Sequence, residues 1–172
     1  PGASTTDATR NCGPTEWTGP AAGDPSGLFV DITDKVGLDF QRAIGPLGTY
    51  FLPEINGSGG AMFDYDGDGD LDIYVSNYRL VPNFLWQNDG KGNLANVSKA
   101  FGTDGDGGLG AWGHTIGSCF GDLDSDGRID IFVGNFSHPP AYQDRPKFLR
   151  NLGKAKKFHF QDPVSYTHLT LP

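Results

Sequence analysis

The chain has 172 residues, 37% of them hydrophobic, and a formal net charge of −8 at pH 7. This length suffices for one ordinary globular domain, and no run approaches the roughly 20 consecutive apolar residues needed to span a bilayer. Nine of the 21 acidic residues lie in two short loops together with one of the 13 Lys and Arg, so the other 12 acidic residues are balanced by 12 basic ones. The negative charge is therefore local rather than a property of the whole surface. We expect neither a membrane span nor a nucleic-acid partner.

The first 26 residues consist almost entirely of Pro, Gly, Ala, Ser, Thr and Asp, with Trp17 as the one large apolar side chain. Such a segment cannot bury enough surface to order itself. We interpret residues 1–26 as a disordered linker and expect the folded repeats in residues 27–163. Because the chain begins at Pro1 and not at methionine, the absence of a signal peptide carries no information about secretion.

The first acidic loop is Asp64–Asp72 (DYDGDGDLD), with carboxylates at loop positions 1, 3, 5 and 9. Calcium takes six to eight oxygen ligands at about 2.3–2.6 Å, and alternate residues of a tight loop can point their carboxylates at one centre. Gly69 at position 6 permits the backbone to reverse, and Asp70 at position 7 would add its main-chain carbonyl. The sequence thus predicts a calcium site whose side-chain ligands are Asp64, Asp66, Asp68 and Asp72.

The second acidic loop, Asp122–Asp130 (DLDSDGRID), repeats this layout with Gly127 at position 6. The main-chain carbonyl at position 7 would come from Arg128. The predicted side-chain ligands of this second calcium ion are Asp122, Asp124, Asp126 and Asp130. The alternative interpretation is a solvated acidic turn, and the duplication of the loop argues against it.

The segments that leave the loops distinguish this arrangement from an EF-hand. An EF-hand needs a bidentate Glu at position 12 and a helix on each side, but here position 12 is Val75 or Val133. The segments Leu71–Asn77 (LDIYVSN) and Ile129–Asn135 (IDIFVGN) alternate apolar residues and are rich in β-branched ones, which predicts strands. Both faces of each segment carry apolar side chains, as expected for inner strands that are covered on both sides.

The similarity between the two halves extends beyond the loops. Residues 60–77 match residues 118–135 at a shift of 58, and the segment from Phe29 matches the segment from Leu94 at a shift of 65. Downstream, FLWQNDGKG matches FLRNLGK at a shift of 64, and the extra six residues fall between residues 135 and 147. A period near 60 residues with about four short strands per unit predicts a β-propeller or another β-repeat array.

The succession of FxDxT, FDYDGDGDLDIYV and FLWQNDGKGN resembles the FG-GAP or VCBS repeat, in the version found in proteins of the ASPIC/UnbV (cartilage acidic protein-like) type. The resemblance covers roughly residues 29–162. It implies an all-β fold of about two blades of an incomplete calcium-binding β-propeller. It also implies that the side-chain ligands of the two ions are the eight aspartates named above.

These features predict a calcium-stabilised binding or scaffolding module, secreted or at the cell surface (extracellular or periplasmic). Its partners would be a protein or glycan ligand and the propeller blades that this chain lacks. We expect no enzymatic activity, because no nucleophile, zinc or phosphate-loop motif is present. Two alternatives are an accessory propeller of a larger secreted enzyme, for example a polysaccharide-degrading one, and a calcium-triggered switch, for which the sequence shows no bistable element.

Other motifs carry weaker signals. The GDGGLG segment at residues 105–110 matches a dinucleotide fingerprint but lacks the strand and helix that must flank it. His114 is expected to form structural hydrogen bonds, and Trp86 is expected in the core. The loop between residues 135 and 147 offers Phe136, Tyr142 and Arg145 as candidates for ligand recognition.

Two further expectations concern the cysteines and the C-terminal tail. Cys12 and Cys119 could form a disulfide, although a pairing cannot be deduced from sequence. The tail, Val164–Pro172 (VSYTHLTLP), resembles the translated read-through of a sequencing adapter. We therefore expect this tail to be non-native and the natural repeat pattern to be interrupted at about residue 163.

Overall fold

The computed structural model describes residues 29–40, 59–78, 80–105, 112–136 and 145–163. The chain divides into two units, residues 1–32 and 33–172. In the first unit, residues 29–32 form neither helix nor strand and are exposed. The predicted linker 1–26 and the predicted tail 164–172 lie outside the described residues. None of the helices in the described residues is both long and apolar enough to cross a membrane.

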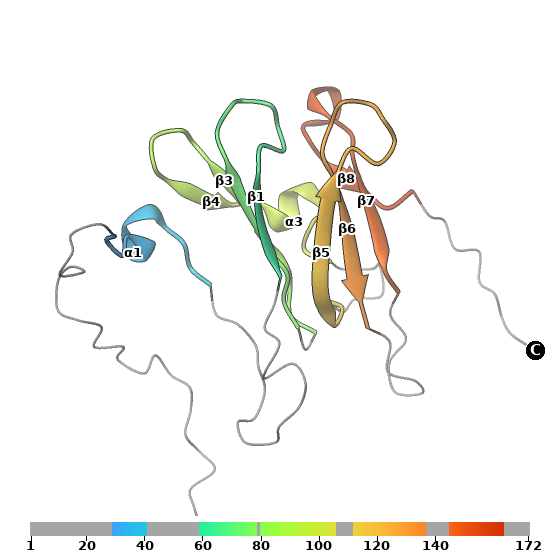
Figure 1. The fold of residues 1–172 in the computed structure, drawn as a ribbon, viewed down its shortest axis with the longest axis horizontal. Coiled ribbons are helices and arrows are strands. Elements are labelled where there is room, and N and C mark those ends of the chain that lie inside the picture. Colours follow the sequence, from blue (N-terminus) through green and yellow to red (C-terminus); the bar gives the residue numbers. More distant parts are fainter. Residues whose placement is uncertain (1–28, 41–58, 79, 106–111, 137–144, 164–172) are drawn as a thin grey trace, which may run out of the picture. The chain divides into compact units, whose positions relative to one another are not determined.

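The second unit contains a first antiparallel sheet of four strands that follow one another in sequence order (Figure 1). The strands are β1 (Gly60–Phe63), β2 (Asp72–Val75), β3 (Phe84–Asn88) and β4 (Leu94–Asn96). Two short helices flank this sheet in the sequence, α1 (Thr33–Val36) before it and α3 (Ser98–Phe101) after it. In β2, Asp72 and Tyr74 are buried while Ile73 and Val75 are half-buried, which confirms a strand covered on both faces.

A second antiparallel sheet repeats the same strand order. Its strands are β5 (Thr115–Gly121), β6 (Asp130–Asn135), β7 (Lys147–Asn151) and β8 (Phe160–Gln161), with a short 3-10 helix, η1 (Lys154–Lys156), between the last two. The structure thus confirms an all-β fold built from two units of four strands, the number found in one propeller blade. Within the described residues the two sheets do not close into a ring.

The strand register corrects the predicted alignment of the third strands. Leu85 pairs with Tyr74 in the first sheet, and Phe148 pairs with Phe132 at the same place in the second. Tyr74 and Phe132 are related by a shift of 58, so the third strands are related by a shift of 63 and not 64. A slip of one residue in a strand moves every side chain to the other face. Leu85 therefore corresponds to Phe148, and the second connection is longer by five residues instead of six.

The core lies between the two sheets. The face of the first sheet that carries Tyr74 and Leu85 packs against the face of the second that carries Ile131 and Val133, and all four side chains are fully buried. Phe120 bridges the sheets, with its ring centroid 5.5 Å from that of Tyr74. Other buried members of this cluster are Phe63, Tyr65, Leu149 and Phe160.

Polar contacts fix how the two sheets meet. The hydroxyls of Ser76 and Ser118 share a hydrogen bond of 2.7 Å, and Asn83 Nδ2 donates to Thr115 Oγ1 at 3.1 Å. The backbone of β5 approaches the start of β1 so closely that a Cβ on Gly59 would lie 3.4 Å from the Cα of Gly117. Each sheet is therefore held against the other at both its apolar centre and its strand ends.

The outer face of the second sheet differs from the equivalent face of the first. Phe132 occupies the position of Tyr74 one repeat later, yet it is 39% exposed. Leu123, the equivalent of Tyr65, is 52% exposed. The prediction that the strand after each loop is covered on both faces is therefore wrong for β6 within the described residues, because no third sheet packs on it there.

The positions of Tyr74 and Phe132 allow a matched test of this packing. We expect Tyr74→Ala to lower the free energy of unfolding by about 3–5 kcal/mol, because it leaves a cavity between the sheets. Phe132→Ala removes a ring that is partly in water and should cost only about 1 kcal/mol. Urea unfolding of both variants measures the difference. Equal losses would show that the two repeats do not pack in this order.

Candidate metal centre

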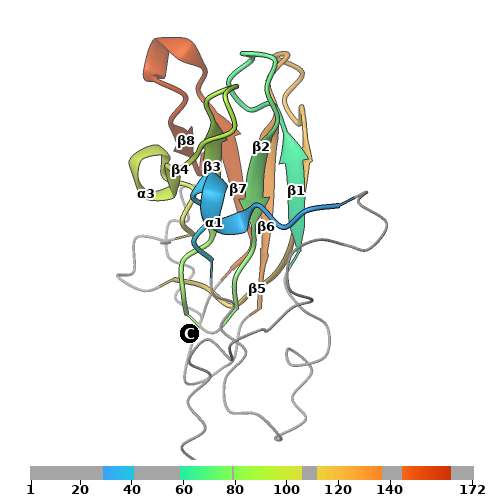
Figure 2. The same ribbon diagram turned by 90° about the vertical axis from the view of Figure 1, so that its left-hand side faces the viewer.

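Each acidic loop joins the first strand of its sheet to the second, and Figure 2 shows both loops at the same end of the strands. In the first loop Asp64 acts as an internal anchor. Its Oδ1 accepts the N–H of Gly67 at 2.7 Å, and its Oδ2 accepts the N–H of Gly69 at 3.0 Å. Gly69 has φ of +94°, which a residue with a side chain rarely adopts. The expected backbone reversal at position 6 is thus confirmed.

The second loop folds in the same way. Asp122 accepts the N–H groups of Asp126 and Gly127, each at 2.9 Å, and Gly127 has φ of +85°. The loops differ at position 4, where Gly67 is replaced by Ser125 with φ of +62°. A serine in this left-handed conformation is strained. The second loop therefore reaches the same shape at a higher conformational cost.

The last aspartate of each loop is fully buried and ties the loop to the third strand of its sheet. Asp72 accepts the N–H of Tyr65 at 3.1 Å and the N–H of Asn88 at 2.9 Å. Asp130 accepts the N–H of Leu123 at 3.1 Å and the N–H of Asn151 at 2.8 Å. Hydrogen bonds to a charged acceptor stabilise by about 1.5–3 kcal/mol each. Both carboxylates are therefore structural elements of the fold.

The structure brings three carboxylates of each loop together. One oxygen from each of Asp64, Asp66 and Asp72 lies within 4.8 Å of the others, and the same holds for Asp122, Asp124 and Asp130. Hard oxygen donors at this spacing on a preformed loop fit a divalent cation such as calcium. Asp68 and Asp126 lie outside these two groups. The role of all eight aspartates as ligands stays a prediction. The same is true of the main-chain carbonyls of Asp70 and Arg128.

The electrostatics of the first loop favour a bound cation. Burial raises the pKa of Asp72 to about 6. Its two backbone hydrogen bonds lower this pKa, and the negative charges of Asp66 and Asp68 raise it further. Burial and the neighbouring Asp68 also raise the pKa of Asp66. Asp66 and Asp72 are thus held close to other negative charges, and a cation at the centre of the loop would relieve this repulsion.

The side chains of two arginines contact the second loop. The sequence interpretation named Arg128 only for its main-chain carbonyl and did not include Arg150. Arg128 pairs with Asp126, and Arg150 on β7 pairs with both Asp124 and Asp126. Partial desolvation disfavours the charge on Asp126, but the N–H of Arg128 and the Arg150 guanidinium outweigh it and hold its pKa below the ordinary value. The strand register is the signal that could have found Arg150, because it places this residue beside the loop.

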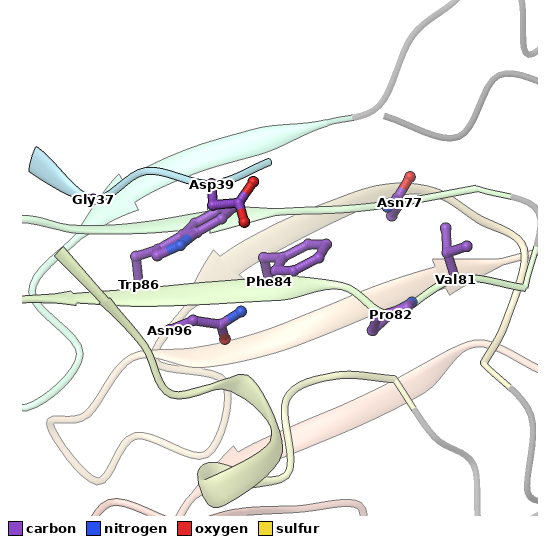
Figure 3. A pocket seen from close by; sticks show the side chains of 8 residues that line it. All are labelled: Gly37, Asp39, Asn77, Val81, Pro82, Phe84, Trp86 and Asn96. Carbon is purple, nitrogen blue, oxygen red and sulfur yellow. The ribbon is translucent and has the colours of Figure 1, made fainter. Parts of the chain in front are cut away.

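A pocket of about 600 Å³ lies on the first sheet, away from the face that packs on the second (Figure 3). The stacked rings of Phe84 and Trp86, with centroids 5.0 Å apart, form its floor, and Asn96 and Asp39 add polar atoms. Phe40 contacts both rings edge-on. Trp86 is 1% exposed, as expected of a core residue. None of the residues of the acidic loops lines this pocket.

The remaining sequence candidates do not form a second site in the described residues. His114 packs against Tyr78 with centroids 4.8 Å apart, in keeping with a structural role. Phe136 is exposed, and Arg145 pairs with Asp162 at 3.6 Å, while Tyr142 lies outside the described residues. Cys119 is an exposed free thiol; Cys12 and most of the GDGGLG segment lie outside the described residues.

The fold and the loops together define a repeat-built all-β protein with one acidic loop per sheet. Residues 64–133 match the family described as FG-GAP-like repeat. A stretch of 68 residues is 34% identical to cartilage acidic protein 1 of Xenopus tropicalis and covers 40% of this chain and 10% of that protein. These matches confirm the resemblance predicted from the sequence, over a shorter stretch than residues 29–162. FG-GAP repeats are elements of β-propellers, so the two sheets are about two blades of one.

The buried aspartate of the first loop provides a test that needs no metal. Asn in place of Asp72 has one acceptor oxygen, so one of the two N–H groups of Tyr65 and Asn88 would face an NH₂ group. We expect Asp72→Asn to cost about 1–3 kcal/mol of unfolding free energy in EDTA. Asp70→Asn, in the same loop, is the matched control and should change the stability little. A loss of equal size in both variants would contradict the structural role of Asp72.

Proposed function

We propose that the chain is a calcium-stabilised module of an extracellular β-propeller, and that its role is binding or scaffolding. The observation that carries this proposal is the pair of preformed loops, each with three carboxylates within 4.8 Å of one another. The loops connect strands that also form the core. A bound ion would therefore stabilise the packing of each sheet without taking part in chemistry.

The expected strength of binding supports an extracellular setting. A site with a dissociation constant of about 0.1 mM in about 1 mM free calcium would stabilise the fold by roughly 1.4 kcal/mol. Such a site fills outside cells and stays empty at the sub-micromolar calcium of a cytosol. The similarity to a protein named for cartilage points the same way.

Binding rather than catalysis is favoured because the clustered carboxylates are used within the loops themselves. Asp64 and Asp72 accept backbone N–H groups with both of their oxygens. The matched family is a structural and binding repeat. We propose that Phe136, which is 47% exposed beside the connection to β7, belongs to a surface that binds a protein or glycan ligand.

We also propose that a further propeller blade covers the outer face of the second sheet. Phe132 and Leu123 are exposed there, whereas their equivalents in the first sheet, Tyr74 and Tyr65, are buried beneath the second sheet. A repeat array continues by packing the same face of each unit on the next. The covering blade would belong to the remaining length of the protein.

Thermal unfolding in calcium tests the function of the loops. We expect 1 mM calcium to raise Tm by about 3–6 °C for each filled site, since each adds roughly 1.4 kcal/mol. Magnesium at the same concentration should have a smaller effect, because it demands a smaller octahedral site and dehydrates reluctantly. Calorimetric titration gives the number of ions bound.

The matched control replaces two carboxylates in each loop while leaving the buried aspartates in place. The fourfold variant Asp64→Asn, Asp66→Asn, Asp122→Asn and Asp124→Asn should fold in EDTA but show no rise of Tm in calcium. An unchanged Tm of the original chain in 10 mM calcium would defeat the proposal.

A further inference from the structure

One position of the third strand contacts the acidic loop in both sheets but carries a different residue in each. The register of β3 and β7 makes Gln87 equivalent to Arg150, since Trp86 pairs with Ile73 and Leu149 pairs with Ile131. The next residue confirms this equivalence: the N–H of Asn88 and that of Asn151 bind the last aspartates of their loops. A direct comparison of the two loops is therefore possible.

In the first sheet the residue at this position has a neutral side chain, which donates a hydrogen bond to the loop. Gln87 Nε2 donates to Asp66 Oδ2 at 2.8 Å, at loop position 3. Loop position 7 is Asp70, whose carboxylate adds a further negative charge. The first loop thus holds five carboxylates and receives no cationic side chain from β3.

In the second sheet the same two positions hold arginines. Arg150 pairs with Asp124, the equivalent of Asp66, and reaches Asp126 at 3.3 Å. Arg128, at loop position 7, pairs with Asp126 and donates from Nε to the carbonyl of Asn151 at 2.8 Å. Two of the four carboxylates of this loop are therefore already neutralised by the chain itself.

We propose that the residue at the position of Gln87 and Arg150 sets how strongly each loop binds calcium, so that the first loop is the stronger site and Arg150 occupies part of the second in place of the ion. The proposal rests on the proposed function, because it assumes that the loops take calcium. The second loop would gain little stability from the ion, whereas the first would gain more.

The physical basis is competition for the same oxygens. The oxygen of Asp124 that contacts the Arg150 guanidinium cannot at the same time coordinate calcium. The ion must therefore displace Arg150 or bind next to its positive charge. For partly exposed charges, solvent and salt screen most of the Coulomb energy. A single positive charge within a few Å of a divalent ion then weakens its binding by roughly tenfold.

Reciprocal substitutions test the proposal by calorimetric calcium titration of the 172-residue chain. To report on one loop at a time, the other is disabled by Asp64→Asn with Asp66→Asn, or by Asp122→Asn with Asp124→Asn. We expect the first loop to bind at least roughly tenfold more tightly than the second. Arg150→Gln should raise the affinity of the second loop by about tenfold, and Gln87→Arg should lower that of the first by about tenfold.

Arg145→Gln is the matched control, because it also replaces an arginine by glutamine. The partner of Arg145 is Asp162, which lies outside the loops. It should leave both affinities within twofold. Urea unfolding in EDTA checks that every variant is folded. Equal affinities of the two loops, or no response to either reciprocal substitution, would overturn the proposal while leaving the proposed function intact. If neither loop bound calcium at 10 mM, the proposed function would fail with it.

Discussion

The structure of each sheet depends on one buried carboxylate at the end of its acidic loop. Asp72 and Asp130 are fully buried, and each accepts one N–H from the start of its loop and one from the third strand. Burying a charge costs several kcal/mol unless its acceptor sites are filled. The two N–H groups offset part of this cost and fix the loop, the second strand and the third strand relative to one another. The register of the whole sheet follows from this contact.

The same contact explains what could be predicted from the sequence. The spacing of Asp and Gly within nine residues is a local pattern. The loops, the positive φ of the glycine at position 6 and the strands that follow were therefore predictable from the amino-acid sequence alone. The register of the third strand is not local. FLWQNDGKG and FLRNLGK align best at a shift of 64, because Phe and Leu recur in both, but the hydrogen bonds of Asn88 and Asn151 require a shift of 63. Identical residue types in two aligned strands do not determine which face of the sheet each side chain occupies.

The corrected register changes the chemistry assigned to the loops. At a shift of 64 Arg150 would correspond to Trp86, on the opposite face of the strand from Gln87, and the sequence would give no reason to place it beside Asp124. At a shift of 63 it corresponds to Gln87, and both side chains contact the carboxylate at loop position 3. Two loops with the same acidic motif therefore differ in their charged surroundings, because the third strand presents neutral Gln87 to one and cationic Arg150 to the other. Position 7 of the loop, Asp70 in one and Arg128 in the other, adds to this difference. An acidic motif defines the oxygens available to an ion, and the neighbouring strand determines the competition for them.

The repeat also separates what stabilises a sheet from what joins one sheet to the next. Asp72 and Asp130 act within their own sheets, and both are equally buried. Tyr74 and Phe132 act between sheets, and their exposure differs because one has a following sheet and the other has none among the described residues. An ion in a loop stabilises mainly the sheet that contains it, since its ligands come from one connection. Such an ion does not cover the apolar face of the second sheet. A rigid loop and a covered face are therefore provided by separate parts of each repeat.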